Sequence, residues 1–200
     1  FKDKGGAYTV TNAGKYRNGP VSLQTALAIS PNTTFVALED RIGSIDPVVD
    51  MAYRLGMRQS LMARDAEGRT ISEAVKKERR GSYTLGPEPT SPLDLANVGA
   101  TLMSGGKWSP PTPIDAVLDR NGDPVTLPEA PCEQVVPEGL ANSLAVGLSK
   151  DDQPGGTAFA AAKAANWTRP MLGKTGTTTA NRSAGFIGAT ESRRTMKSLT

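Results

Sequence analysis

Four consecutive residues near the end of the chain carry groups that could bind a carboxylate. Lys174, Thr175, Gly176 and Thr177 place a cation, two hydroxyls and a position without a side chain on one expected strand. The lysine can pair with a substrate carboxylate, and the hydroxyls can donate hydrogen bonds to it. A strand-edge N–H can face a developing oxyanion, and the glycine lets a substrate approach the main chain. The same residues also fit an edge strand with a solvated lysine, so other motifs must decide.

The composition limits which catalytic groups are present. The 200 residues contain no histidine, which excludes Ser-His-Asp and Cys-His catalysis and histidine-ligated zinc. The single cysteine, Cys132, can form neither an intrachain disulfide nor a thiolate metal cluster, and we expect no cofactor. A net charge of +3 with both signs dispersed gives no reason to expect nucleic-acid binding. Proton transfer must therefore use lysine, carboxylates, tyrosine or hydroxyls.

Helices are predicted on both sides of a polar corner at residues 30–32. Residues 21–29 are a short apolar run of helix formers, and residues 32–43 are a second run that closes at a glycine. Residues 46–56 combine an N-cap aspartate, a first-turn proline and a closing glycine. The corner is therefore expected to be held between helices.

The middle of the chain alternates polar segments and capped helices. Residues 59–90 are charged and rich in turn residues, which predicts loops with a brief strand at 82–85. Within them, the charge run at 76–80 is typical of a solvated face. Ser91 and the proline that follows it predict a buried helix that ends before Gly105.

The last elements should build the strand that carries the lysine. Residues 114–119 and 124–127 predict a hairpin around Asn121-Gly122, since this dipeptide tolerates positive φ at both turn positions. Three further elements are expected: a helix over 137–150, a helix over 155–166 that starts at a Thr157 cap, and an antiparallel hairpin of residues 170–177 and 183–190. The predicted fold class is therefore α+β, rich in helix, with the sheet hairpin near the C-terminal end.

Several blocks of the sequence resemble class A penicillin-binding proteins, the bifunctional peptidoglycan synthases. The motif at residues 30–32 (Ser-Pro-Asn) and that at 174–176 (Lys-Thr-Gly) are similar to two of the three motifs of penicillin-interacting enzymes, the third being Ser-x-x-Lys. The segments 16–43, 82–111 and 155–190 resemble that family's flanking blocks in the same order. The resemblance implies the penicillin-binding-protein/serine β-lactamase-like transpeptidase fold, a helical subdomain plus an antiparallel sheet.

What the resemblance implies for activity is a peptidoglycan D,D-transpeptidase domain. In that family a serine attacks the D-Ala-D-Ala carbonyl of a stem peptide and releases D-alanine. The acyl group then passes to an amine of a neighbouring strand, and β-lactams trap the serine by mimicking the donor. Lysine with a lowered pKa serves as the base, which suits a chain without histidine.

The resemblance also implies roles for the matched residues. Ser30 would relay a proton between the catalytic lysine and the leaving group, and Asn32 would orient that lysine and the substrate amide. Lys174 would set the positive potential of the cleft. Thr175 and Thr177 would hold the terminal carboxylate, and the Thr177 N–H would be one oxyanion donor.

The sequence departs from the family in its nucleophile. The family's Ser-x-x-Lys motif precedes Ser-x-Asn by several tens of residues, and 29 residues precede Ser30 here. The literal match at 104–107 (Ser-Gly-Gly-Lys) follows Ser-x-Asn and lies at an expected helix end, so we reject Ser104 as the nucleophile. Residues 1–200 are thus expected to be an internal part of a transpeptidase domain. The nucleophile segment would lie upstream, the last strand and helix downstream, and this fragment alone would be inactive.

Two alternatives stay open. A serine β-lactamase shares both motifs, but no water-activating glutamate loop is recognisable, and the separation of Asn32 from Lys174 is longer than that family uses. A non-catalytic peptide-binding module of a cell-wall assembly protein could use the same cleft without covalent chemistry.

The expected partners follow from the transpeptidase interpretation. They are peptidoglycan stem peptides, β-lactam antibiotics and a glycosyltransferase domain in the same full-length chain. The longest uncharged stretch, residues 19–38, contains two prolines, so neither a membrane span nor a signal peptide is predicted here. Attachment to the extracytoplasmic face of the cell membrane would therefore use a segment outside this chain.

Overall fold

The computed structural model describes residues 2–3, 6–7, 9–14, 19–128, 130–178 and 182–190. The helices are α1 (Leu23–Ile29), α2 (Asn32–Ile42), α3 (Asp46–Leu55), α4 (Arg58–Met62), α5 (Ile71–Glu78), the 3-10 helix η1 (Gly81–Leu85), α6 (Pro92–Met103), α7 (Glu138–Gly147) and α8 (Phe159–Ala164). The strands are β1 (Lys2–Asp3), β2 (Gly6–Ala7), β3 (Lys107–Trp108), β4 (Glu133–Gln134), β5 (Leu172–Thr177) and β6 (Ala184–Ala189). They form three antiparallel pairs, so the expected mixture of helices and small antiparallel sheets is confirmed.

The polar corner lies between two helices, as predicted. Helix α1 begins at Ser22, whose hydroxyl accepts a hydrogen bond from the N–H of Thr25 at 3.1 Å. It ends at Ser30, and α2 starts two residues later, because Pro31 cannot continue a helix. The corner is therefore fixed from both sides.

Residues 59–90 are more helical than predicted. They contain most of α4, all of α5 and the 3-10 helix η1, so the expected loops and the strand at 82–85 were wrong. A capping box starts α5: the Thr70 hydroxyl accepts from the Glu73 N–H at 3.1 Å, and the Glu73 carboxylate accepts from the Thr70 N–H at 2.8 Å. Buried residues of α3 to η1 form one core cluster: Ile45, Val49, Leu61, Val75 and Tyr83. These residues are helical because they pack into this core and because the capping box starts α5, and the prediction of loops took neither into account.

The charge run at 76–80 is paired in part. Arg80 forms ion pairs with Glu78 and Glu88, both at 2.8 Å, and Lys76 pairs with Asp50. The Glu78 side chain is 7% exposed. The prediction of a solvated face is therefore wrong for Glu78, whereas the side chains of Lys76 and Arg80 stay partly exposed in their ion pairs.

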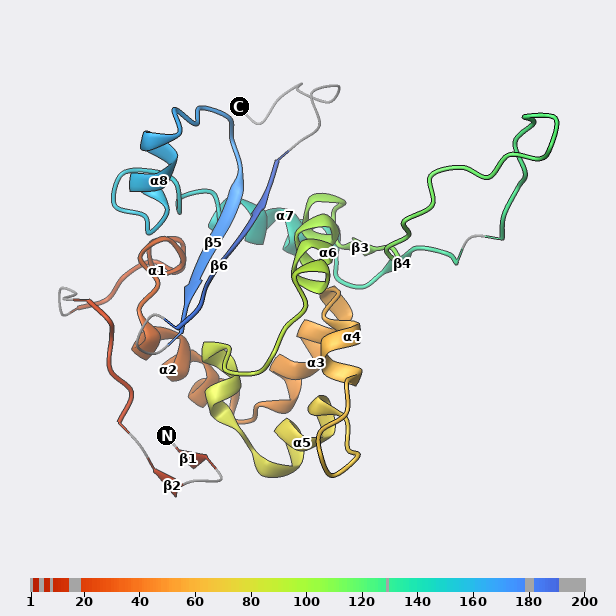
Figure 1. Ribbon diagram of the computed structural model, residues 1–200. Helices are drawn as coiled ribbons and strands as arrows, with labels where there is room; N and C mark the ends of the chain where they lie inside the picture. The colour runs from red at the N-terminus through yellow and green to blue at the C-terminus, as the bar shows by residue number, and fades with distance from the viewer. Residues whose placement is uncertain are drawn as a thin grey trace.

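Helix α6 connects the helical part to the hairpin β5–β6 (Figure 1). Ser91 caps it, and the buried Asp94 accepts a hydrogen bond from the Ser60 N–H at 2.7 Å. A β-carbon at Gly99 would lie 3.4 Å from Ile187, which shows how closely α6 packs against β6. The predicted buried helix is confirmed.

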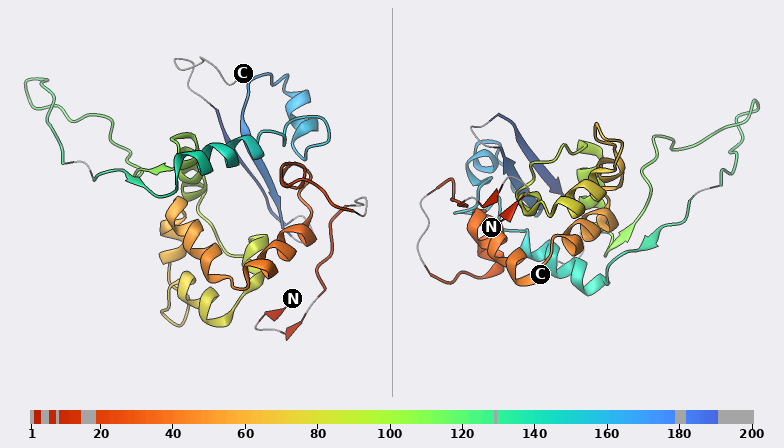
Figure 2. Two further views of the ribbon diagram at one scale, coloured as in Figure 1. Left: turned by 180° about the vertical axis from the view of Figure 1, so that it is seen from behind. Right: turned by 90° about the horizontal axis from the view of Figure 1, so that it is seen from below.

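The hairpin β5–β6 is antiparallel, as predicted, and runs from Leu172 opposite Ala189 to Thr177 opposite Ala184. Helix α7 packs against one end of β5, as Figure 2 shows from behind. A second core cluster joins α6, α7 and β5, and its buried members are Leu102, Val136, Ala141 and Leu172. The turn predicted between the strands lies outside the described residues at 179–181.

Helices α7 and α8 are shorter than their predicted ranges. Helix α7 ends at Gly147, and α8 starts at Phe159 instead of residue 155. Its N-cap is Ala158, so the predicted Thr157 cap is wrong. Residues 151–158 form a tight turn instead, and the Thr157 hydroxyl hydrogen bonds within it to Asp151.

Between β3 and β4 the chain forms a long arm that projects from the body (Figures 1 and 2). The predicted hairpin is present as one bridge, Leu118 opposite Pro124, without continuous strands. Gly122 has a positive φ of 88°, whereas Asn121 does not, so positive φ at both positions was wrong. The Asp119 carboxylate holds the turn by accepting two backbone N–H bonds.

Arg58 anchors the base of this arm. Its guanidinium lies 3.4 Å from the centroid of the Trp108 ring and forms an ion pair of 2.9 Å with Glu133. In the described part of the chain, no helix is both long and apolar enough to cross a membrane.

Candidate active site

Ser30 has an unusual backbone conformation. Its φ of 57° and ψ of 49° lie in the left-handed region, where residues other than glycine are uncommon. The Ser30 N–H closes α1 by donating to Ala26 O at 2.8 Å. The strained conformation thus falls at the polar corner that sequence reasoning singled out.

Lys174 reaches this serine from the opposite end of the sequence. Its Nζ donates to Ser30 Oγ at 2.7 Å and to the backbone oxygen of Thr175 at 2.8 Å. Ser30 and Lys174 are 144 residues apart in sequence, so the fold joins the two motifs directly. Burial lowers the pKa of Lys174, and the charge of Asp151 partly opposes this shift.

The hairpin register sets the direction of the Thr177 N–H. The Thr178 N–H donates to Ser183 O across the hairpin at 3.0 Å, and alternate residues of an antiparallel strand point their N–H groups to opposite edges. Gly173 follows this alternation, since its N–H donates outward to Leu148 O at 3.0 Å. The Thr177 N–H therefore points away from β6, on the side that a substrate could approach.

A cavity of about 850 Å³ lies beside Thr177. Its lining includes Asn32, Thr177, Thr178 and Arg182, together with residues 9–13, and no carboxylate lines it among the described residues. A β-carbon added at Gly176 would meet nothing within 4 Å, so the main chain of β5 is open there. The site can therefore receive an extended polar ligand along β5.

Asn32 contacts a different part of the site from Lys174. Its amide donates to Thr11 O at 2.9 Å, and next to it the Thr33 N–H donates to Asn12 Oδ1 at 3.1 Å. These bonds fix residues 11 and 12 over the start of α2. The structure thus brings Ser30 and Lys174 into contact and places Asn32 with Thr177 on the neighbouring cavity.

Thr175 contacts a pair of residues that sequence reasoning did not assign to the site. Its hydroxyl is hydrogen bonded to the Thr157 hydroxyl, which is also bonded to the Asp151 carboxylate. The sequence could have indicated Thr157, because it lies in a block that resembles the family, but it was interpreted as a helix cap. Nothing in the sequence indicated Asp151, because its contact with Thr157 depends on the turn between α7 and α8.

The rejected candidate Ser104 lies at the end of α6. Its hydroxyl bonds to the backbone oxygens of Thr101 at 3.1 Å and Lys107 at 2.5 Å. The hydroxyl therefore satisfies the helix end, in agreement with the rejection. No group of three acidic or cysteine side chains suited to a metal ion occurs among the described residues.

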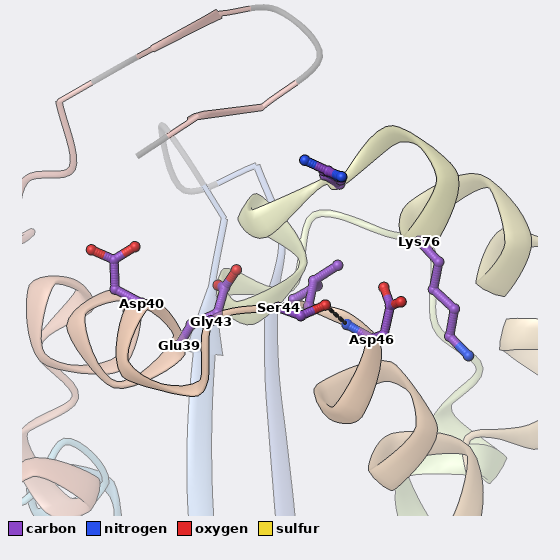
Figure 3. Close-up of a pocket in the computed structure, with 8 residues that line it drawn as sticks. Glu39, Asp40, Gly43, Ser44, Asp46 and Lys76 are labelled. Carbon is purple, nitrogen blue, oxygen red and sulfur yellow. Dashed lines mark hydrogen bonds between the residues drawn. The ribbon is translucent and has the colours of Figure 1, made fainter.

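A second cavity, of about 490 Å³, lies near the C-terminal end of α2 (Figure 3). Acidic and basic side chains share its rim, among them Glu39, Asp46 and Lys76, and the Asp46 N–H donates to Ser44 Oγ at 3.2 Å. None of the matched motif residues lines it. The contact between Ser30 and Lys174, together with the neighbouring cavity that Asn32 and Thr177 line, is therefore the candidate active site.

Known proteins match most of this chain. The family model described as "Penicillin binding protein transpeptidase domain" matches residues 2–192. Penicillin-binding protein 2D of Bacillus subtilis (strain 168) is 32% identical over 183 residues, which cover 89% of this chain and 24% of that protein. Penicillin-binding protein 1B of Vibrio cholerae is 29% identical over 187 residues, 92% of this chain and 22% of that protein. The chain thus spans about a quarter of the length of these relatives.

Two solved structures share the fold of this chain. The penicillin-binding protein PonA1 from Mycobacterium tuberculosis superposes with a TM-score of 0.70 and 24% identity, covering 90% of this chain and 47% of that one. The D,D-transpeptidase domain of a peptidoglycan glycosyltransferase from Eggerthella lenta gives 0.67 and 25%, covering 90% and 48%.

Proposed function

Because this chain belongs to the penicillin-binding protein transpeptidase domain family, we propose that it forms part of a peptidoglycan D,D-transpeptidase. The observation that carries the proposal is the 2.7 Å hydrogen bond from Lys174 Nζ to Ser30 Oγ. It joins a Ser-x-Asn and a Lys-Thr-Gly motif beside the cavity that Asn32 and Thr177 line. A chain without histidine can perform acyl transfer with these groups, because lysine and hydroxyls carry the protons.

The nucleophilic serine and the lysine that activates it belong to a Ser-x-x-Lys segment outside these 200 residues. In the first step that serine attacks the D-Ala-D-Ala carbonyl, the peptide C–N bond breaks, and D-alanine leaves with a proton on its amine. The lysine of that segment takes the proton of the attacking serine. Ser30 gives its own proton to the leaving amine, and the same lysine returns a proton to Ser30. The Ser30 oxygen accepts a hydrogen bond from Lys174, so the Ser30 proton is available for donation to the leaving group.

The other residues bind and orient the donor peptide. The positive charge of Lys174 and the Thr177 hydroxyl hold its terminal carboxylate. The Thr177 N–H stabilises the oxyanion, and Asn32 binds a substrate amide beside the cavity. In the second step an amine of a neighbouring strand attacks the acyl-enzyme, which restores the serine and forms the cross-link.

The proposal extends to partners and location. Relatives named penicillin-binding protein 1A and 1B match most of this chain, and class A proteins of this kind also carry a glycosyltransferase domain. We place such a domain in the same full-length chain and the transpeptidase on the extracytoplasmic face of the cell membrane. β-Lactams would acylate the nucleophilic serine.

Release of D-alanine from a stem pentapeptide by the complete protein tests the proposal. We expect Ser30→Ala to slow release about 100-fold or more, because a proton relay is lost, and Ser104→Ala to leave it unchanged. No release by the wild-type protein, or full activity of Ser30→Ala, would refute the assignment.

Hydrolysis of nitrocefin separates the two alternatives. A transpeptidase should be acylated once and recover slowly, whereas rapid turnover would identify a serine β-lactamase. Peptide binding with neither acylation nor turnover would identify a non-catalytic module.

A further inference from the structure

Helix α2 begins without a capping side chain of its own. Its N-cap residue is Pro31, which makes no side-chain hydrogen bond to the helix. The first N–H groups of a helix have no partner inside the helix, so another group must accept from them. Here that group comes from a distant segment, because the Thr33 N–H donates to Asn12 Oδ1 at 3.1 Å. Asn12 therefore caps α2 from 21 residues away, with a side chain of the kind that helix starts prefer.

The Asn12 amide holds Thr33 with both of its polar atoms. Its Nδ2 donates to the Thr33 hydroxyl at 3.0 Å, and the same hydroxyl lies 3.2 Å from Asn12 Oδ1. Residues 9–14 are neither helix nor strand, and among the described residues they make no backbone-to-backbone hydrogen bond. Their position over the start of α2 therefore depends on side-chain hydrogen bonds, those of Asn12 and Asn32.

The neighbouring hydrogen bond acts on the Ser-x-Asn motif. Asn32 Nδ2 donates to the backbone oxygen of Thr11, the residue before Asn12, at 2.9 Å. An asparagine amide has two N–H groups and one oxygen. Thr11 takes one N–H, which restricts the rotation of the Asn32 amide. The second N–H and Oδ1 have no hydrogen-bond partner in the part of the chain that the structure describes. Since Asn32 lines the cavity beside Thr177, these two groups can pair with a peptide amide there.

We propose that Asn12 is a positioning residue of the transpeptidase site. By capping α2 it holds the Thr11 oxygen against Asn32, and this contact presents the Asn32 amide to the cavity in one orientation. Asn12 acts through Asn32 and touches no reacting atom in this role. The inference rests on the proposed function, and it gives the segment before α1 a part in the recognition of the donor peptide.

The choice of substrate separates this role from simple stabilisation of α2. A cap that only stabilises the helix affects all substrates alike, whereas a residue that orients Asn32 matters for substrates with an amide to bind. Benzylpenicillin carries such an amide on its side chain. The related compound 6-aminopenicillanic acid has the same β-lactam ring and carboxylate, but a free amine replaces the amide. A comparison of the two compounds therefore tests the positioning role.

Acylation of the complete protein by these two compounds is the first experiment. We expect Asn12→Ala to slow acylation by benzylpenicillin about tenfold, the effect of one hydrogen bond, and acylation by 6-aminopenicillanic acid by less than about twofold. In an Asn32→Ala protein, the added Asn12→Ala change should slow benzylpenicillin by less than about twofold, because the residue it positions is absent. Equal slowing with both compounds, or independent effects of the two substitutions, would overturn the proposal.

Three further variants show whether the effect is specific. Asn142→Ala, at an exposed asparagine of α7, should leave both rates unchanged. Ser91→Ala removes the cap of α6, which does not line the cavity, so it should lower the thermal stability without changing the ratio of the two rates. Thr33→Val keeps the N–H and removes only the hydroxyl that Asn12 binds. It is the milder variant if Asn12→Ala fails to fold, and it should slow benzylpenicillin more than the other compound.

NMR of the Asn32 side-chain amide tests the positioning without catalysis. Because Thr11 binds one of its protons in the wild-type protein, exchange of the amide protons with water should be faster in folded Asn12→Ala and unchanged in Asn142→Ala. Unchanged exchange in folded Asn12→Ala would refute the positioning role. A wild-type protein that neither compound acylates would instead refute the proposed function, and the NMR result would still decide the role of Asn12.

Discussion

At the scale of residues, the site depends on one contact between two motifs. The Lys174 ammonium bonds to Ser30, while burial and the charge of Asp151 act on its pKa in opposite directions. The motifs could be found from the sequence, because their residue types and spacing match a family pattern. Their contact could not, since it depends on α1, β5 and the turn before α8 meeting in space.

Replacing Lys174 tests the electrostatic role directly. We expect Lys174→Ala in the complete protein to slow acylation by penicillin about 100-fold, because one preorganised donor to a developing charge is lost. Lys163→Ala, an exposed lysine on α8, is the control and should leave the rate unchanged. An acylation rate within twofold of wild type in Lys174→Ala would remove this role, and thermal unfolding would check that the variant folds.

The pH dependence of acylation should report the state of Lys174. Burial lowers its pKa below the ordinary value of 10.5, so the rate should fall as the pH rises through this lowered value. The free energy of unfolding should instead rise with pH. Between the pKa of Lys174 in the folded protein and its higher pKa in the unfolded chain, the unfolded chain binds more protons. The cost of burying the Lys174 charge is therefore complete below the folded-state pKa and is lost as the pH rises through the unfolded-state pKa. Stopped-flow acylation from pH 6 to 10 measures the first effect, and a flat profile would contradict it.

At the scale of elements, local signals predicted some segments and failed on others. Ser91 and Ser22 both cap helices, and their segments were recognised as helices. The capping box of Thr70 and Glu73 is an equally clear signal, but the charges around it favoured loops, so α5 was missed. Those charges form ion pairs in the fold, such as Arg69 with Asp65 at 2.7 Å, which a reading of local composition could not show.

Other differences have tertiary causes. The start of α8 was placed too early, because Thr157 looked like a cap while Asp151 in fact binds its hydroxyl. The arm around Gly122 was expected to form strands, but it projects from the body and lacks the neighbours that support longer strands.

Gly156 gives a test of the turn that supports β5. An alanine there would place its β-carbon 2.1 Å from a backbone oxygen. We expect Gly156→Ala to lower the free energy of unfolding by about 1–3 kcal/mol, the cost of overpacking. Gly139→Ala on α7 is the matched control, since a β-carbon there meets nothing within 4 Å, and it should be neutral or stabilising. Chemical denaturation measures both, and equal stabilities would show that the turn can relax.

At the scale of the whole molecule, one core cluster holds the helical part together and a second joins it to the hairpin. The cluster around Val49 and Leu61 supports α3 to η1, and the one around Leu102 and Leu172 joins α6, α7 and β5. The family match over residues 2–192 agrees with this architecture. The fold class could be predicted because its elements are short and clearly bounded. The packing of α6 against β6 could not, because it follows from contacts distant in sequence.

Mapping the penicillin adduct on the complete protein by mass spectrometry tests the proposed transpeptidase function in one measurement. We expect one covalent adduct, on the serine of a Ser-x-x-Lys motif outside these 200 residues, and slower formation of this adduct in Ser30→Ala. Absence of an adduct, or an adduct on a serine within the 200 residues such as Ser104, would contradict this function.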